Sequence, residues 1–203
     1  MQVVGLSTSP RANGNSERLL LRALEGAASA GAKTEMLRLA DYTIGPCTEC
    51  NYCCRTGACI IDDDCDALVQ RLRAADGFIF ATPVFFSGIC AQAKALIDRA
   101  QSFWAAKHIL GQTRPAAENR PQAMVIATGG SRGTRQFECV KLTMKYYLDA
   151  LEADYRLNLF VSQLDSVEDL EQHPSAMGEA FRLGAELASP SSRSEMPLDV
   201  KLY

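Results

Sequence analysis

The 203-residue chain lacks the features that mark membrane proteins and nucleic-acid-binding proteins. No stretch approaches the roughly eighteen apolar residues that a membrane helix needs, and residues 1–7 carry neither the basic region nor the long apolar core of an export signal. Lysine and arginine number 21 against 24 aspartates and glutamates, so no basic face is available for nucleic acid. We therefore expect a cytoplasmic protein with neither a membrane nor a nucleic acid as partner.

Histidine is scarce, and two common nucleotide-binding motifs are absent. His108 and His173 lie outside every motif described below, and no catalytic acid or base stands out. The chain contains neither the G-x-x-x-x-G-K-[ST] loop of nucleoside triphosphatases nor the G-x-G-x-x-G fingerprint of dinucleotide domains. A bound nucleotide is therefore expected to be a mononucleotide.

Short apolar runs alternate with helical patterns along the chain. Residues 77–83 are apolar throughout, as a strand buried on both faces of a parallel sheet should be. Strand and helix alternate five times, which predicts a flavodoxin-like, doubly wound α/β fold with a five-stranded parallel sheet in the order 2-1-3-4-5. One domain over residues 1–188 is expected, followed by an extended or disordered arm over residues 189–203. The expected strands are 3–6, 33–39, 77–83, 122–128 and 155–161, and the expected helices are 17–30, 64–75, 90–103, 137–150 and 175–187.

Polar or glycine-rich loops follow three of these strands, at the end where parallel sheets bind ligands. Residues 7–16 precede a helix and supply hydroxyls, amides, backbone N–H groups and Arg11, all of which favour a phosphate. An ordinary polar loop with Asn15 or Ser16 as helix cap is the alternative. Residues 82–88 add two aromatic rings, and the glycine-rich turn 128–133 lets the backbone approach a planar ligand. Together the three loops describe a site for FMN.

Five of the eight cysteines lie within residues 46–62, and four of them form one motif. Cys47, Cys50, Cys53 and Cys59 form C-x2-C-x2-C-x5-C, a spacing that lets thiolates converge on one centre. Thiolate sets of this kind suit an iron–sulfur cluster or zinc. Reduced, structural or disulfide-forming cysteines are the alternative, and disulfides rarely persist in the cytoplasm.

These motifs together resemble the NAD(P)H-dependent FMN reductase family and, within it, the iron–sulfur flavoproteins. The resemblance runs in order from residue 1 to about residue 135. It rests on the cysteine motif and on four further segments: Ser9-Pro10-Arg11-x-Asn13-Gly14-Asn15-Ser16, Ala75-Asp76-Gly77, Thr82-Pro83-Val84-Phe85-Phe86 and Lys94-Ala-Leu-Ile-Asp98-Arg99. One departure is Phe85, which stands where the family often has tyrosine, so that a phenolic donor near the flavin would be absent.

The resemblance implies a noncovalently bound FMN, a [4Fe-4S] cluster near the flavin, and NAD(P)H as a co-substrate. It also implies a homodimer or homotetramer, often with the cluster close to the flavin of another subunit. The cluster ligands would be Cys47, Cys50, Cys53 and Cys59. The residues implied at FMN are Ser9, Arg11, Asn13, Asn15 and Ser16 around the phosphate, Pro83, Val84, Phe85, Phe86, Ser87 and Gly88 beside the isoalloxazine, and Thr128, Gly129, Gly130, Ser131 and Gly133 closing the ring pocket.

Three functions are consistent with these features. FMN accepts two electrons as hydride and can release them singly, whereas a [4Fe-4S] cluster carries one at a time, so the first is electron transfer with a ferredoxin or another redox partner. The second is NAD(P)H-dependent reduction of a flavin or quinone without a cluster. The third is a flavin-binding module whose cysteine loop binds zinc or acts as a thiol switch. The long segment 104–120 is expected to cover the flavin or a neighbouring subunit.

Overall fold

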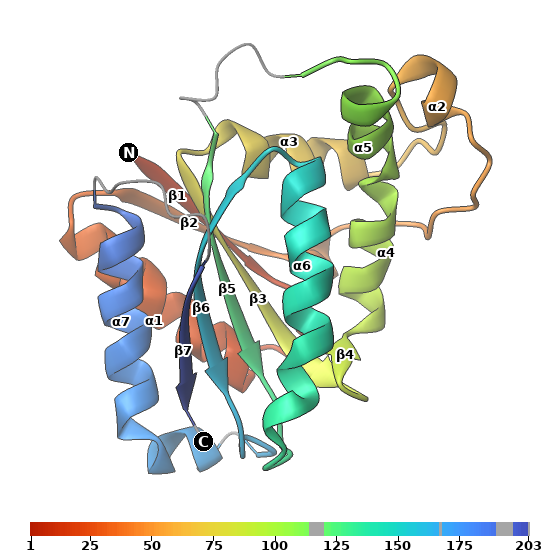
Figure 1. The fold of residues 1–203 in the computed structure, drawn as a ribbon. Coiled ribbons are helices and arrows are strands. Elements are labelled where there is room, and N and C mark those ends of the chain that lie inside the picture. The colour runs from red at the N-terminus through yellow and green to blue at the C-terminus, as the bar shows by residue number, and fades with distance from the viewer. Residues whose placement is uncertain (114–119, 167, 190–196, 203) are drawn as a thin grey trace.

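A parallel sheet lies between two layers of helices in the computed structural model, which describes residues 1–113, 120–166, 168–189 and 197–202 (Figure 1). The strand order is β2-β1-β3-β5-β6-β7, with β4 paired to β3. The strands are β1 (Gln2–Ser7), β2 (Lys33–Arg38), β3 (Gly77–Phe85), β4 (Gly88–Ile89), β5 (Gln122–Thr128), β6 (Asp154–Val161) and β7 (Leu198–Leu202). The helices are α1 (Asn15–Ser29), α2 (Cys53–Thr56), α3 (Cys65–Ala74), α4 (Ala91–Arg99), α5 (Gln101–His108), α6 (Glu138–Ala150) and α7 (Pro174–Leu187).

The central strand β3 shows why the sheet is covered on both faces. Phe78 and Phe80 pack into the core on the side of α3, α4 and α6, whereas Ile79 and Ala81 pack into the core on the side of α1 and α7. Successive side chains of a strand point to opposite faces, so an unbroken apolar run needs two apolar layers. The flavodoxin-like class and the 2-1-3-4-5 order of the five predicted strands are confirmed.

The sheet has two strands more than the five predicted. β4 is a two-residue strand that folds back on β3 through a tight turn, which is too short to give a sequence pattern. β7 lies within the predicted arm 189–203 and pairs in parallel with β6. Its alternate side chains Val200 and Leu202 pack against the core. Such alternation of buried and exposed side chains is typical of a strand with one buried face. The single predicted helix 90–103 is instead two helices, α4 and α5, which meet at Ala100.

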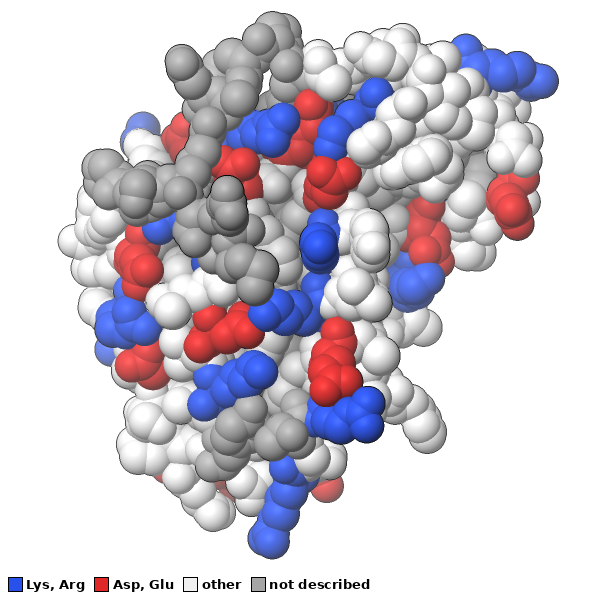
Figure 2. Space-filling view, in the orientation of Figure 1, with Lys and Arg blue, Asp and Glu red and all other residues white. Residues whose placement is uncertain are grey.

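The surface carries both signs of charge. Figure 2 shows acidic and basic side chains interspersed over most of one face, with mostly uncharged side chains in the region of α2. In the described part of the chain, no helix is both long enough and apolar enough to cross a bilayer.

Candidate functional site

The loop after β1 is organised by the buried carboxylate of Glu17. Glu17 accepts hydrogen bonds from Ser7 Oγ at 2.8 Å and from the backbone N–H of Asn13 at 3.0 Å, and it pairs with Arg38 at 3.3 Å. These contacts hold the loop over the start of α1. Sequence reasoning missed Glu17, although an acidic residue in the first turn of a helix is a common stabilising feature.

The start of α1 offers donors to an anion. The helix is capped by Gly14, which makes no side-chain capping hydrogen bond, so neither Asn15 nor Ser16 is the cap. The first N–H groups of a helix have no partner within the helix, and the helix dipole is positive at this end. A phosphate would therefore find both hydrogen-bond donors and a favourable field at the start of α1.

The loop after β1, the carboxyl end of β3 and the turn after β5 meet in one pocket of about 140 Å³ at the carboxyl edge of the sheet. The loop after β6, which sequence reasoning did not include, contributes Leu164 and Asp165. An acidic residue shortly after a strand end was the available signal for Asp165. The other lining residues are Ser9, Arg11, Gly14, Asn15, Ser16, Pro83, Val84, Phe85, Thr128, Gly129 and Gly130. The predicted residues Asn13, Phe86, Ser87, Gly88, Ser131 and Gly133 are not among them.

The turn after β5 is held from behind by Gln136. Its Nε2 donates to the carbonyl oxygens of Ser131 at 2.6 Å and Gly133 at 2.9 Å, so these two predicted residues shape the turn and do not line the pocket. A Cβ on Gly129 would lie 2.1 Å from Gln136 Oε1, and no real Cβ contact is that short. Leu164 donates its N–H to Gly129 O at 3.1 Å, which joins the loops after β5 and β6.

The aromatic pair after β3 is split by a tight hairpin. Phe86 and Ser87 both have positive φ angles, 50° and 60°, which is rare for a bulky residue. Phe85 lines the pocket, whereas Phe86 is fully exposed at the tip of the hairpin. The sequence does not show this difference, because it depends on the turn conformation.

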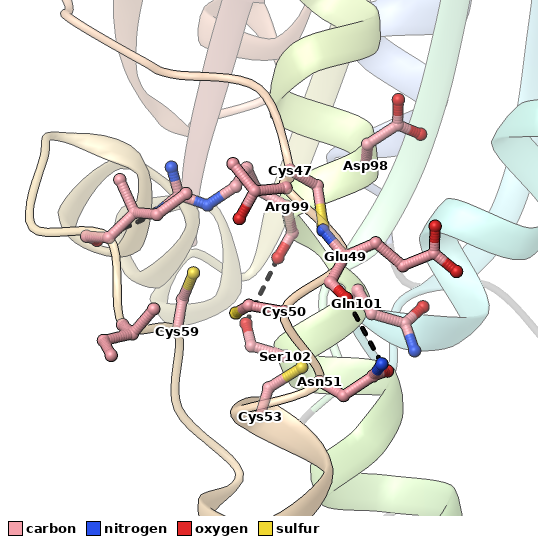
Figure 3. A pocket seen from close by; sticks show the side chains of 13 residues that line it. Cys47, Glu49, Cys50, Asn51, Cys53, Cys59, Asp98, Arg99, Gln101 and Ser102 are labelled. Atoms are coloured by element: carbon pink, nitrogen blue, oxygen red, sulfur yellow. Dashed lines mark hydrogen bonds between the residues drawn. The ribbon is translucent and has the colours of Figure 1, made fainter.

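A second cavity, of about 420 Å³, lies at the carboxyl end of α4 (Figure 3). Cys47, Cys50, Cys53 and Cys59 all line it. The first three come from the outgoing arm of the loop and from the start of α2, and Cys59 comes from the returning arm. The helix side of the cavity is formed by Asp98, Arg99, Gln101 and Ser102.

An ion pair holds together the two ends of the cysteine loop, which comprises residues 46–62. Arg99 is 1% exposed and donates to Asp63 Oδ2 at 2.6 Å, to Gly45 O at 3.1 Å and to Ile61 O at 3.1 Å. Asp63 also accepts the N–H groups of Gly45 at 2.9 Å and Cys65 at 3.0 Å. Burial opposes the ionisation of Asp63, but these hydrogen bonds outweigh it and lower the pKa of its carboxyl. The pair therefore joins both arms of the loop to α4.

The thiols near this cavity differ in environment. Burial, followed by the neighbouring Cys54 and Cys59, raises the pKa of Cys53. Cys65 is fully buried outside the lining of the cavity, and burial raises its pKa to about 12. Cys65 therefore remains a protonated thiol at neutral pH.

The segment after α4 supports the cysteine loop. Helix α5 packs against α2. Gly57, which ends α2 with a φ of 74°, lies so close to Gln112 that a Cβ there would be 2.8 Å from its Oε1. His108 Nε2 lies 3.2 Å from Asp149 Oδ2 and belongs to the contact between α5 and α6. Residues 114–119 lie outside the described chain, and the expectation that segment 104–120 covers the flavin or a neighbouring subunit stays a prediction.

The donor set of the second cavity suits an iron–sulfur cluster or zinc, because all four ligands are thiols and they surround one space. Within the described ranges, however, no group of three or more His, Cys, Asp or Glu side chains is arranged closely enough to hold a metal ion. The structure thus gathers the donors without placing them in ligand geometry.

Helix α4 separates the two cavities. Its N-cap residue Cys90 donates from Sγ to Thr8 O at 3.3 Å, next to the pocket at the sheet edge, and Arg99 at its other end lines the cysteine cavity. Nine helical residues span about 13 Å. In Figure 1 the carboxyl ends of the central strands and the cysteine loop accordingly lie at opposite ends of α4.

The comparison with protein families gives one match. The model of the NADPH-dependent FMN reductase family matches residues 1–153. Among individual proteins, an iron–sulfur flavoprotein of Methanocaldococcus jannaschii is 44% identical over 101 residues, which are 50% of this chain and 52% of that protein. An iron–sulfur flavoprotein of Methanosarcina thermophila is 35% identical over 141 residues, which are 70% of each chain. The match thus spans about half the length of the first relative and more than two thirds of the second.

Solved structures share the fold at low sequence identity. The chain resembles the azoreductase AzrA with a TM-score of 0.67 at 14% identity, covering 92% of this chain and 100% of that one. It resembles a flavone reductase with a TM-score of 0.61 at 21% identity, covering 93% of this chain and 62% of that one. At these identities the likeness concerns the fold alone.

Proposed function

We propose that this chain, which belongs to the NADPH-dependent FMN reductase family, is a flavin-dependent oxidoreductase that transfers electrons. It would hold FMN at the sheet edge and a [4Fe-4S] cluster on its cysteine loop. The observation that carries the proposal is the gathering of Cys47, Cys50, Cys53 and Cys59 around one cavity. The naming of the two archaeal relatives as iron–sulfur flavoproteins supports it.

The residues of the first pocket would bind and orient FMN. Arg11 would pair with the phosphate, which the start of α1 and the hydroxyls of Ser9 and Ser16 would also bind. The turn at Gly129 would place its backbone beside the ring, and glycine is needed there because a Cβ would collide with Gln136 behind the turn. When bound, FMN supplies hydride acceptance and one-electron release. The resemblance-based assignment to the flavin of the predicted residues outside this pocket remains part of the proposal; they are Asn13, Phe86, Ser87, Gly88, Ser131 and Gly133.

The cysteine loop would hold its cluster at the surface. Cys47 and Cys50 are exposed, and Cys53 and Cys59 are partly buried. A cluster there would be open to a redox partner such as a ferredoxin. All eight cysteines are free thiols in the structure.

Assembly as a homodimer or homotetramer is part of the proposal. Trp104, Leu142 and Tyr146 are 40%, 58% and 66% exposed and line a groove between α5 and α6. Exposed apolar groups in one patch favour burial against another chain. Because α4 separates the two cavities of one chain, a second copy would offer a shorter route between cluster and flavin. Light scattering of the FMN-loaded protein should report a dimer or tetramer, and a monomer at high concentration would contradict this assembly.

Reduction of a flavin or quinone by NAD(P)H without a cluster is the second candidate. It is favoured by the absence of ligand geometry among the described cysteines. Steady-state oxidation of NADH or NADPH by the purified FMN form would support this activity. Zinc in place of iron would instead leave a reductase with a structural or regulatory cysteine loop.

The deciding experiment is anaerobic reconstitution with iron and sulfide, followed by iron and labile-sulfide assays and by EPR of the reduced protein. We expect one [4Fe-4S] cluster per chain. Alanine at Cys47, Cys50, Cys53 or Cys59 should sharply reduce the bound iron, whereas Cys54→Ala is the matched control and should retain it. Stoichiometric zinc with no cluster after reconstitution would overturn the electron-transfer proposal.

A further inference from the structure

Arg99 has one donor for which the described part of the chain offers no acceptor. Its two terminal nitrogens bind Asp63, Gly45 and Ile61, which accounts for the guanidinium end of the side chain. Its Nε is buried and has no hydrogen-bond partner among the described residues. A buried donor left unsatisfied costs about 1–3 kcal/mol, so such a group calls for a ligand.

The position of Arg99 indicates where that ligand would be. The side chain is 1% exposed and lines the cysteine cavity, whereas its counter-ion Asp63 does not line it. Of this ion pair, only the positively charged Arg99 therefore forms part of the cavity wall. Cys59 lies close enough to Arg99 for the two side chains to interact electrostatically.

Within the proposed function, we propose that Arg99 donates its free Nε–H to a sulfur of the metal group held in the cysteine cavity and raises the reduction potential of that group. A metal group on four thiolates is anionic, and one-electron reduction adds a further negative charge. Hydrogen bonds to the sulfurs and nearby positive charge both stabilise the reduced form. Arg99 thus holds the cysteine loop through its contacts with Gly45 and Ile61, and through its Nε–H it raises the reduction potential of the bound group.

The direct test uses the wild-type protein, reconstituted anaerobically after growth on arginine labelled with ¹⁵N at Nε. Pulsed EPR of the reduced protein should show coupling between the electron spin and one arginine nitrogen. Coupling that disappears in Arg99→Lys assigns the nitrogen to Arg99. A reconstituted protein whose spectrum contains no arginine nitrogen overturns the inference, whether or not any variant folds.

The second test compares reduction potentials by EPR-monitored titration. Arg99→Lys keeps the charge but not the Nε–H, and Arg99→Met combined with Asp63→Asn removes both charges together, which avoids a lone buried charge. At a fixed potential the ratio of reduced to oxidised cluster should fall at least tenfold in the double variant. This corresponds to a reduction potential lower by about 59 mV for a one-electron couple. The fall should be smaller in Arg99→Lys. The control Lys145→Met removes an exposed cation of α6 that lines neither cavity, and it should leave the potential unchanged.

The outcomes separate this inference from the proposed function. A cluster that forms in all variants at the wild-type potential overturns the role of Arg99 and leaves the electron-transfer proposal standing. A wild-type protein that forms no cluster overturns the proposed function and this inference with it.

Discussion

Replacing Asp63 with alanine should destabilise the fold, because it leaves the buried cation of Arg99 without a counter-ion. Asp63 is 9% exposed and Arg99 1%, and their atoms lie 2.6 Å apart. Removing one partner of a buried ion pair costs about 3–5 kcal/mol, a large part of the roughly 5–15 kcal/mol that stabilises a typical domain. With a urea m-value of about 2 kcal/mol/M, the unfolding midpoint should fall by roughly 1.5–2.5 M.

The assay is urea unfolding of the metal-free protein, followed by circular dichroism and by the fluorescence of Trp104, the only tryptophan. Asp62→Ala is the matched control, because Asp62 is the exposed neighbour in the chain, and it should change stability by no more than about 0.5 kcal/mol. Asp63→Asn keeps an acceptor oxygen and should fall between the two. An Asp63→Ala protein as stable as the control would show that this ion pair does not stabilise the fold.

The same ion pair predicts a pH dependence. The pKa of Asp63 in the folded protein is lower than its ordinary value of 3.8. The stabilising contribution of its carboxylate is therefore complete above that ordinary value and is lost as the pH falls through the lower, folded pKa. Asp63→Ala should accordingly lose less stability than the wild type as the pH falls below about 4.

The flavin pocket yields two further predictions. Arg11→Ala should weaken FMN binding by about 1.5–3 kcal/mol, or roughly 10- to 150-fold in Kd by flavin fluorescence titration, with Arg11→Lys retaining part of the affinity. An unchanged Kd would mean that the phosphate lies elsewhere. Gly129→Ala should weaken FMN binding at least about tenfold, because its Cβ would collide with the side chain behind the turn. Gly178→Ala is the control: a Cβ there meets nothing within 4 Å, so FMN binding should not change and the melting temperature should not fall. Equal FMN affinity in both glycine variants would show that FMN binding does not depend on the shape of this turn.

The alternation of apolar runs and helical patterns was enough to predict the fold class and the order of five of the strands. This works because a strand buried on both faces must be apolar throughout, as residues 77–83 are, and because right-handed crossovers leave few topologies. The loops that ligands would meet could be located for the same reason, since the carboxyl ends of parallel strands share one edge. The spacing of Cys47, Cys50, Cys53 and Cys59 also predicted that the four would share one site, and all four line one cavity.

Contacts between segments distant in the sequence could not be predicted in this way. The ion pair of Arg99 with Asp63 joins α4 to a loop 36 residues away, and Asp165 reaches the pocket only because β6 lies beside β5. Phe85 and Phe86 are adjacent and chemically identical, yet the positive φ at Phe86 turns one ring away from the pocket that the other lines. Periodicity and local motifs report which face of an element is buried. Which distant side chain satisfies a buried charge is decided only when the elements pack, because that depends on the positions of all the neighbouring atoms.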